Sequence, residues 1–524
     1  MIPAIAILGN NLDAELKRAF QDLASVLLLR AEFFVGANLH EVAGIVCVGD
    51  LPETLPAVPV FQFVLEKQKS PDVTGGTIEF AGHKTSPVFL RGRKWPLGKE
   101  SGWGFLDEKQ SGEVVAAING RPVWKIARVR GSTVWSVSTP LPRLRVGERL
   151  SQYLNGETFL PLLPLYLFLR AISSESRWQS PPLRACMVVD DPNLHARSYG
   201  HIDFQSLVQL ARERPFHAAM AMVPLDGWWT NAATARIFRE NPQALSLLIH
   251  GNDHLRCELA RSFQNGGRDA LVFQSLSRIA ALEHKANVRV DRVMAPPHGV
   301  CAPEMFSALR AGGYEGMTTN RWSLWKHNPP DHLPVNVGLH PADLPGGLPV
   351  LNRFRFRSSI CEGEILMAAI LGQPIIPYGH HQDFSDDMIH VRGVMEKINS
   401  LPARWLSLRE ILETNYEHYL DSGTFHLRPF SRRVKLTLPP DAGSIQIASA
   451  PFLAEKPPAF EIISPQKRFY VQTDVSISVP SGVELEIREV AAALLKTSAV
   501  HFARKSPAAG LRRVAAEIRD RLKI

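Results

Sequence analysis

The chain has 524 residues, of which 45% are apolar and 21% charged, and its net charge is +8. This length exceeds what one ordinary hydrophobic core accommodates, so several domains are expected. The composition is that of an average globular protein, which excludes wholesale disorder and fibrous repeats.

Cysteine content and apolar segments bear on the cellular location. The cysteines are odd in number, scattered and never in a C-x-x-C pair, which argues against a disulfide framework: Cys47, Cys186, Cys257, Cys301 and Cys361. The first apolar residues lack a basic segment before them and are more typical of a strand than of a secretion signal. The longest apolar stretch, residues 159–169, is shorter than the ~20 residues of a membrane-spanning helix. We therefore expect a cytoplasmic protein without a transmembrane helix.

The first 175 residues predict an α/β domain. Strand-like segments at 4–8, 44–49 and 58–64 and a helical pattern at 12–28 have the rhythm of a parallel sheet. Asn119-Gly120 then separates two strand-like segments and predicts a tight hairpin. We expect a Rossmann-like or flavodoxin-like fold. Since it contains no G-x-G-x-x-G or P-loop, and Cys47 lies inside an apolar strand, a structural or docking role is favoured.

Residues 183–418 predict a closed or nearly closed β/α barrel, because seven or eight strand-like segments alternate with helical patterns. These segments are residues 185–189, 217–223, 245–249, 292–294, 316–319, 350–354, 375–378 and 405–408. A β-sandwich is predicted over 423–498, because shorter alternating runs punctuated by Pro, Gly and Ser follow there. These runs are residues 434–438, 445–447, 460–463, 470–472, 475–479 and 483–487.

The remaining residues, 499–524, hold seven Lys/Arg against two acids, which is +5 of the total charge. Apolar residues fall there at helical spacing: Leu511, Val514, Ala515, Ile518 and Leu522. We expect a basic amphipathic helix that packs on its own protein. The alternative is a helix that contacts a membrane surface or a partner in a polysaccharide assembly. No nucleic-acid-binding motif accompanies the charge, so nucleic acid is not expected as a partner.

Four polar clusters directly follow predicted barrel strands. They are Asp190-Asp191, the segment from His250 to His254, Pro296-Pro297-His298-Gly299, and His380-His381. Since the carboxyl ends of barrel strands open on one rim, residues far apart in sequence are expected to meet there.

The first two clusters predict a metal site. Two adjacent carboxylates at a buried strand end are costly to ionise unless a cation offsets them, although Asp191-Pro192 is also typical of a turn. An i,i+4 histidine pair on a helical turn would present both imidazoles of His250 and His254 to one ion. Two imidazoles and a carboxylate suit Zn²⁺, with Co²⁺ or Ni²⁺ as alternatives.

The order and spacing of these clusters resemble NodB-homology polysaccharide deacetylases, whose motifs read T-F-D-D, H-(S/T)-x-x-H, R-x-P-x-G and L-x-H. The resemblance implies that Asp190 is the general base and that Asp191, His250 and His254 bind the metal. It implies that His380 or His381 is the general acid. Pro296, Pro297, His298 and Gly299 would form one wall of the substrate site and Trp322 its aromatic wall. The domain order also resembles that of Pel-type exopolysaccharide deacetylases.

The chain departs from these motifs at three positions. Pro192 stands where a glycine often follows the Asp pair. Gly251 stands where Ser or Thr is usual, and Ala295 stands where the family's arginine pairs with the catalytic aspartate. Arg197 and Arg353 are the candidates to replace that arginine.

The expected activity is hydrolytic removal of N-acetyl groups from amino sugars of a poly- or oligosaccharide or its precursor. One alternative is a catalytically silent carbohydrate-binding or scaffold protein, which the missing arginine favours. Another is a metal-dependent glycosidase, with Asp253 or Asp383 as its second carboxylate.

Overall fold

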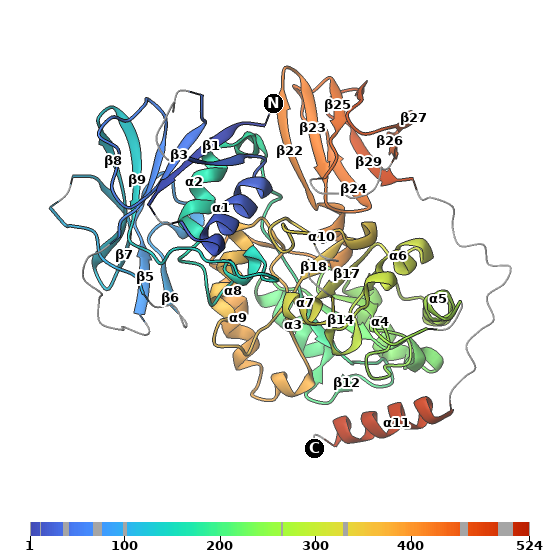
Figure 1. Cartoon of the computed structure of the whole chain (residues 1–524). Coiled ribbons are helices and arrows are strands. Elements are labelled where there is room, and N and C mark those ends of the chain that lie inside the picture. Colours follow the sequence, from blue (N-terminus) through green and yellow to red (C-terminus); the bar gives the residue numbers. More distant parts are fainter. Residues whose placement is uncertain are drawn as a thin grey trace. The chain divides into compact units, whose positions relative to one another are not determined.

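A computed structural model describes residues 2–10, 12–34, 41–65, 76–97, 102–109, 111–263, 266–328, 334–450, 459–490 and 507–522 (Figure 1). The chain forms two compact units. The first comprises Met1–Gln179, Val335–Val337 and Glu362–Ile370, and the second comprises Ser180–Pro334, Gly338–Cys361 and Leu371–Ile524. None of the described helices is long and apolar enough to cross a membrane.

The first unit is built on a nine-stranded mixed sheet with the order β2-β1-β3-β4-β9-β8-β7-β5-β6. Its strands are β1 (Ala4–Gly9), β2 (Arg30–Phe34), β3 (Gly44–Val48), β4 (Val60–Phe63), β5 (Gly76–Phe80), β6 (Lys94–Leu97), β7 (Glu113–Ile118), β8 (Arg121–Val129) and β9 (Ser132–Val137). The helices are α1 (Ala14–Val26), α2 (Leu163–Ile172) and α8 (Cys361–Ile370).

Only part of this sheet has the parallel arrangement that the sequence predicts. Strands β2, β1, β3, β4 and β9 pair in parallel, whereas β8, β7, β5 and β6 continue the sheet as antiparallel strands. The predicted hairpin joins the antiparallel β7 and β8, where Asn119 and Gly120 both adopt positive φ. The change to antiparallel pairing itself occurs at the next turn, where Arg130 and Gly131 connect β8 to β9. Cys47 is fully buried in β3, and burial raises the pKa of its thiol to about 12, which leaves no reactive thiolate there.

The second unit contains the predicted β/α barrel. Eight parallel strands run in the order β18-β17-β16-β15-β14-β11-β20-β19. They are β11 (Met187–Asp190), β14 (Ala218–Met222), β15 (Leu245–Ile249), β16 (Val290–Met294), β17 (Gly316–Thr319), β18 (Val350–Asn352), β19 (Phe354–Arg355) and β20 (Pro377–Gly379). Most of their residues are buried, as expected for strands covered on both faces.

One residue joins the two ends of this strand order. β18 pairs with β17, β19 pairs with β20, and only Arg353 separates β18 from β19 along the chain. The backbone N–H of Arg353 donates to Thr319 O on one side, and that of Phe354 donates to Ile376 O on the other. The sheet is therefore nearly closed, and the fold class predicted from the sequence is confirmed.

Helices alternate with these strands: α3 (Phe204–Glu213), α4 (Ala232–Glu240), α5 (Gly267–Ala286), α6 (Pro303–Gly312), α7 (Arg321–His327), α9 (Ile389–Asn399) and α10 (Leu408–Glu413). The expectation of a barrel strand at 405–408 is wrong. There β21 (Arg404–Trp405) pairs only with β10 (Arg184–Ala185), outside the barrel sheet. The reason is local: Ser407 and Glu410 form a reciprocal capping box that begins α10 at Leu408.

Two four-stranded sheets with a common apolar core follow the barrel in the same unit. One contains β22 (Tyr416–Asp421), β23 (Thr424–Pro429), β25 (Ser444–Ile447) and β28 (Ser476–Ser478). The other contains β24 (Arg433–Thr437), β29 (Glu484–Glu489), β26 (Phe460–Ile463) and β27 (Arg468–Val471). The last described element is the helix α11 (Pro507–Arg521).

Candidate metal centre

The four polar clusters lie at strand carboxyl ends of the barrel, as the parallel arrangement requires. Asp190 is the last residue of β11, and His250 directly follows β15. The Pro296–Gly299 segment follows β16, and His380 directly follows β20. Because all barrel pairings are parallel, these ends open on the same rim.

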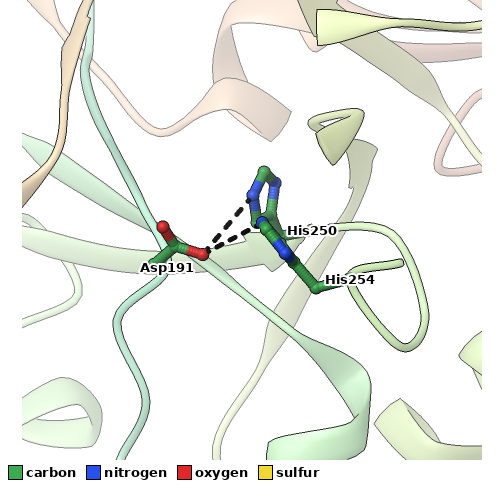
Figure 2. Close-up of side chains that lie close together, drawn as sticks. All are labelled: Asp191, His250 and His254. Carbon is green, nitrogen blue, oxygen red and sulfur yellow. Dashed lines mark ion pairs between the residues drawn. The ribbon is translucent and has the colours of Figure 1, made fainter. Parts of the chain in front are cut away.

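Asp191, His250 and His254 converge on one point (Figure 2). Asp191 Oδ1 lies 3.8 Å from His250 Nε2 and 3.2 Å from His254 Nε2. One potential ligand atom from each residue lies within 4.8 Å of the others, a spacing that a single ion can bridge. Asp191 and His254 adopt positive φ, 81° and 54°, a strained conformation for residues with a side chain.

The two imidazoles are prepared to act as ligands. The Nδ1 of His250 donates to Ala295 O at 2.8 Å, which fixes the ring and leaves Nε2 directed at Asp191. Burial lowers the pKa of His250, and burial together with the neighbouring His250 lowers the pKa of His254 to about 3. Both rings are therefore neutral near pH 7, the form that binds a metal.

Asp191 is held in its ionised form. Burial alone would raise the pKa of its carboxyl, but His250, His254 and Arg513 outweigh burial and hold that pKa well below its ordinary range. The site thus offers one anionic oxygen and two neutral nitrogens. This donor set is the two-histidine, one-carboxylate arrangement that suits Zn²⁺ and leaves coordination positions open.

The histidine pair does not lie on a helical turn, so that expectation is wrong. Residues 250–254 form a loop in which Gly251 has a φ of 67°. Glu258 holds this loop, because its carboxylate accepts hydrogen bonds from the backbone N–H groups of Asn252, Asp253 and Leu255 at 2.6, 3.1 and 3.3 Å. A Cβ on Gly251 would lie 1.8 Å from Glu258 Oε1, which explains why no Ser or Thr stands there.

Asp190 is buried next to this triad and pairs with Arg353. The guanidinium donates to both carboxylate oxygens, at 2.7 and 2.8 Å, and it also lies 4.2 Å from the centroid of the Tyr378 ring. Burial opposes ionisation of Asp190, but Arg353 and His250 hold the pKa of its carboxyl below the ordinary value. Of the two candidates, Arg353 is therefore the arginine that pairs with Asp190 where the sequence has Ala295.

The two candidate acids differ in their surroundings. His380 is half-buried, and its electrostatic effect lowers the pKa of both Asp190 and Asp191. His381 is buried and lies 3.4 Å from a carboxylate oxygen of Asp520 in α11. Burial lowers the pKa of His381, with Asp520 acting in the opposite direction. The assignment of either histidine as the acid stays a prediction.

The residues expected to contact the sugar lie near the same rim. Pro297–Gly299 forms a short 3-10 turn, and the His298 ring lies 5.3 Å from that of His254. Trp322, in α7, is 43% exposed. Their binding role stays a prediction.

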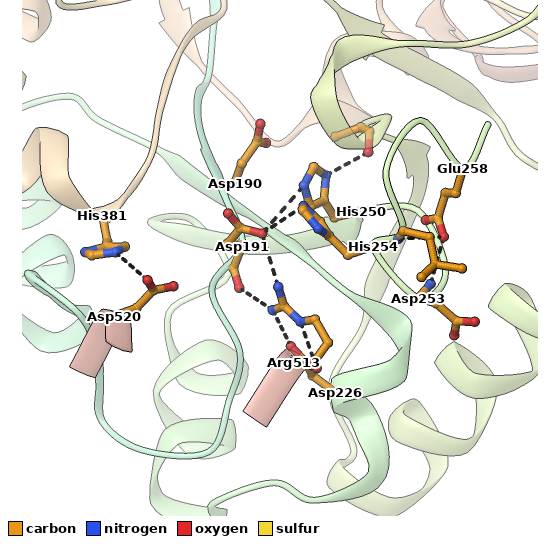
Figure 3. Close-up of polar contacts among 12 residues, drawn as sticks. Asp190, Asp191, Asp226, His250, Asp253, His254, Glu258, His381, Arg513 and Asp520 are labelled. Atoms are coloured by element: carbon orange, nitrogen blue, oxygen red, sulfur yellow. Dashed lines mark hydrogen bonds and ion pairs between the residues drawn. The ribbon is translucent and has the colours of Figure 1, made fainter. Parts of the chain in front are cut away.

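Three contributors to the site could not be found from sequence patterns. Glu258 follows His254 by four residues, and its function depends on how the loop folds. Asp226, in the turn Pro224–Trp228, is buried and accepts a 2.6 Å hydrogen bond from Arg513. Figure 3 shows Arg513 between Asp226 and Asp191, and its nearest contact with Asp191 Oδ1 is 3.5 Å.

Comparison with protein-family models finds no match, and comparison with curated proteins finds none. Among solved structures, the chain is similar to a family 4 carbohydrate esterase from Streptomyces lividans in complex with acetate. That alignment covers 43% of this chain and 93% of the esterase, with 12% identity and a TM-score of 0.28. The alignment with a CE4 esterase from Streptococcus mutans covers 43% of this chain and 87% of that esterase, with 13% identity and a TM-score of 0.26.

A third similar structure has a different activity. A 4-alpha-glucanotransferase from Thermococcus litoralis aligns over 44% of this chain and 40% of its own, with 12% identity and a TM-score of 0.31. At such values the likeness says nothing about chemistry, which therefore rests on the side chains of the site.

Replacing Arg353 with Ala is expected to lower the free energy of unfolding by about 3–5 kcal/mol, because it leaves the buried Asp190 carboxylate unpaired. Arg355→Ala is the matched control, since that side chain is 57% exposed and its ion pair with Asp383 spans 3.6 Å. The control is expected to cost less than about 1 kcal/mol. Urea unfolding measures both variants, and equal losses would contradict a special role for Arg353.

Proposed function

We propose that this chain is a metal-dependent carbohydrate deacetylase that hydrolyses N-acetyl groups of amino sugars in a poly- or oligosaccharide or its precursor. The observation that carries the proposal is the Asp191–His250–His254 triad directly beside a buried aspartate that Arg353 keeps ionised. We propose Zn²⁺ as the metal, with Co²⁺ and Ni²⁺ as alternatives, because the donor set is two imidazoles and one carboxylate. When bound, such an ion polarises an amide carbonyl and acidifies water.

Asp190 has the properties of a general base in this reaction. Its lowered pKa keeps it in the proton-accepting form at neutral pH, and the two hydrogen bonds from Arg353 fix the carboxylate. The proton that Asp190 takes comes from the attacking water. The carbon–nitrogen bond of the acetamide then breaks, and the products are acetate and a free amino sugar.

The departing amine needs a proton donor, which we assign to His380 or His381. Electrostatic coupling to both aspartates favours His380, whereas His381 is paired with Asp520. The exposed ring of Trp322 and the Pro296–Gly299 segment are the surfaces proposed to pack against the sugar.

The alternatives have less support. A silent carbohydrate-binding or scaffold protein was favoured by the arginine missing at Ala295, and Arg353 supplies that pairing. A glycosidase needs a second catalytic carboxylate. Of the two candidates, Asp253 is paired with Arg278 at 2.5 Å, and Asp383 accepts the backbone N–H of His380 at 2.9 Å.

Acetate release from N-acetylated glucosamine and galactosamine oligomers tests the proposal. Asp190→Asn in the metal-loaded protein is expected to lower kcat by about 10²- to 10⁴-fold, the usual contribution of a positioned base. His250→Ala should abolish release through loss of metal. His380→Ala is expected to lower kcat more than His381→Ala does. The exposed Asp421→Asn in β22 is the control, and equal rates for Asp190→Asn and Asp421→Asn would contradict the assignment.

We also propose a cytoplasmic protein whose tail helix contacts a membrane surface. The apolar side chains of α11 point to solvent: Leu511 is 73% exposed, Val514 44%, Ile518 54% and Leu522 63%. Together with the excess of Lys/Arg in residues 499–524, this is the pattern of a helix that lies in an anionic lipid interface.

Sedimentation with vesicles tests this contact. The full chain is expected to pellet with phosphatidylserine-containing vesicles and to stay in solution with neutral ones. The double variant Leu511→Ser with Ile518→Ser should lose binding, because each replaced side chain contributes about 1.5–3 kcal/mol when buried. If the unaltered chain does not bind anionic vesicles, the membrane contact is contradicted, and the exposed apolar side chains of α11 are then proposed to contact a protein partner of a polysaccharide assembly.

A further inference from the structure

The helix α11 contacts the barrel rim through its polar side. The Arg513 side chain is only 7% exposed and bonds to Asp226, and the Asp520 side chain, 4% exposed, accepts a 2.7 Å hydrogen bond from Tyr199 Oη. Glu517 Oε2 lies 2.8 Å from His195 Nδ1. These three residues follow the helical period, so they form one face.

The apolar side of the helix is turned away from the barrel. The exposed residues named above, Leu511, Val514, Ile518 and Leu522, follow the helical period among themselves and form the other face of the helix. An amphipathic helix that is a permanent part of a fold buries its apolar face. Ion pairs and hydrogen bonds hold α11, and polar contacts of this kind can be exchanged for water.

The docked face lies on the proposed metal site itself. Arg513 contacts Asp191, and Arg512 donates to the backbone carbonyl of His254, so α11 contacts two of the three proposed ligand residues. Asp520 lies beside His381, one of the two candidate acids (Figure 3). A sugar whose acetamide must reach Asp191 from this side meets the helix first.

We propose that α11 is an intramolecular cover of the metal site: the docked helix, with Arg513 between Asp226 and Asp191, keeps carbohydrate out, and the site opens when the helix leaves. While it is docked, α11 contacts Asp191 and His254, so it hinders a chelator from reaching an ion held there. The effect on catalysis rests on the proposed deacetylase function and the effect on metal exchange on the proposed metal site, whereas the docking rests on neither.

Three measurements on the full-length chain test the cover: amide hydrogen exchange of residues 507–522, the rate at which a chromogenic chelator removes Zn²⁺, and acetate release. Arg513→Ala removes the contact from the helix side, and Asp226→Asn weakens it from the barrel side. Arg236→Ala is the matched control, because its side chain is 68% exposed and pairs with Glu240 of the same helix, α4. All variants are compared at equal Zn²⁺ loading.

Both contact variants are expected to lose exchange protection in α11 and to release Zn²⁺ faster, whereas the control should do neither. If the docked form holds about nine molecules in ten, opening raises the apparent affinity for the oligosaccharide about tenfold. The expected change is therefore a fall in KM.

Two results would overturn the proposal. One is protection and Zn²⁺ release that stay unchanged in both contact variants. The other is loss of protection with a fall in kcat, which would make Arg513 part of the catalytic site. If no variant releases acetate while exchange and Zn²⁺ release behave as expected, the deacetylase assignment fails and the cover stands.

Discussion

The ion pair between Arg353 and Asp190 joins the closure of the barrel to the chemistry of its rim. Arg353 is the residue between β18 and β19, where the two ends of the strand order meet. Its backbone bonds to β17, and its guanidinium crosses to the end of β11. A buried carboxylate without that partner would take up a proton. Arg353 therefore contributes both to closing the barrel, through its backbone, and to keeping Asp190 ionised, through its guanidinium.

Around this pair the backbone is strained where side chains must point inward. Asp191, His254 and His298 all have positive φ, a conformation that costs free energy for residues with a Cβ. The hydrogen bonds that fix the neighbouring backbone offset this cost, notably the three that Glu258 accepts in the 250–258 loop. Strain of this kind is kept where geometry matters more than stability, which fits a ligand-binding rim.

Much of the barrel follows from its sequence, because strands buried on both faces have short continuous apolar runs, such as residues 245–249. Their ends then place Asp191, His250 and His254 on one rim without further information. Strands β22 and β23 were missed, since charged and polar residues interrupt their pattern. The spacing of His250 and His254 predicts a helical turn, because spacing alone does not reveal the backbone hydrogen bonds that Glu258 accepts in this loop.

Contacts between distant residues could not be read from the sequence. Arg353 and Asp190 are 163 positions apart, and their pairing depends on how the barrel closes. The sequence alone does not distinguish Arg353 from Arg197 as the arginine that pairs with Asp190. The tail was expected to bury its apolar residues against the protein. It docks through Arg513, Glu517 and Asp520 instead, because the rim that it meets is lined with Asp226, His195, Tyr199 and His381.

The proposed function depends on the binding of one metal ion by Asp191, His250 and His254. X-ray absorption spectroscopy of the full chain loaded with Zn²⁺, with the bound ion counted, tests it most directly. One ion per chain is expected, with two imidazole nitrogens at about 2.0–2.1 Å and further oxygens. Binding should be lost in His250→Ala and His254→Ala and kept in Asp190→Asn. A chain that binds no ion, or that keeps the same spectrum in His250→Ala, would contradict it.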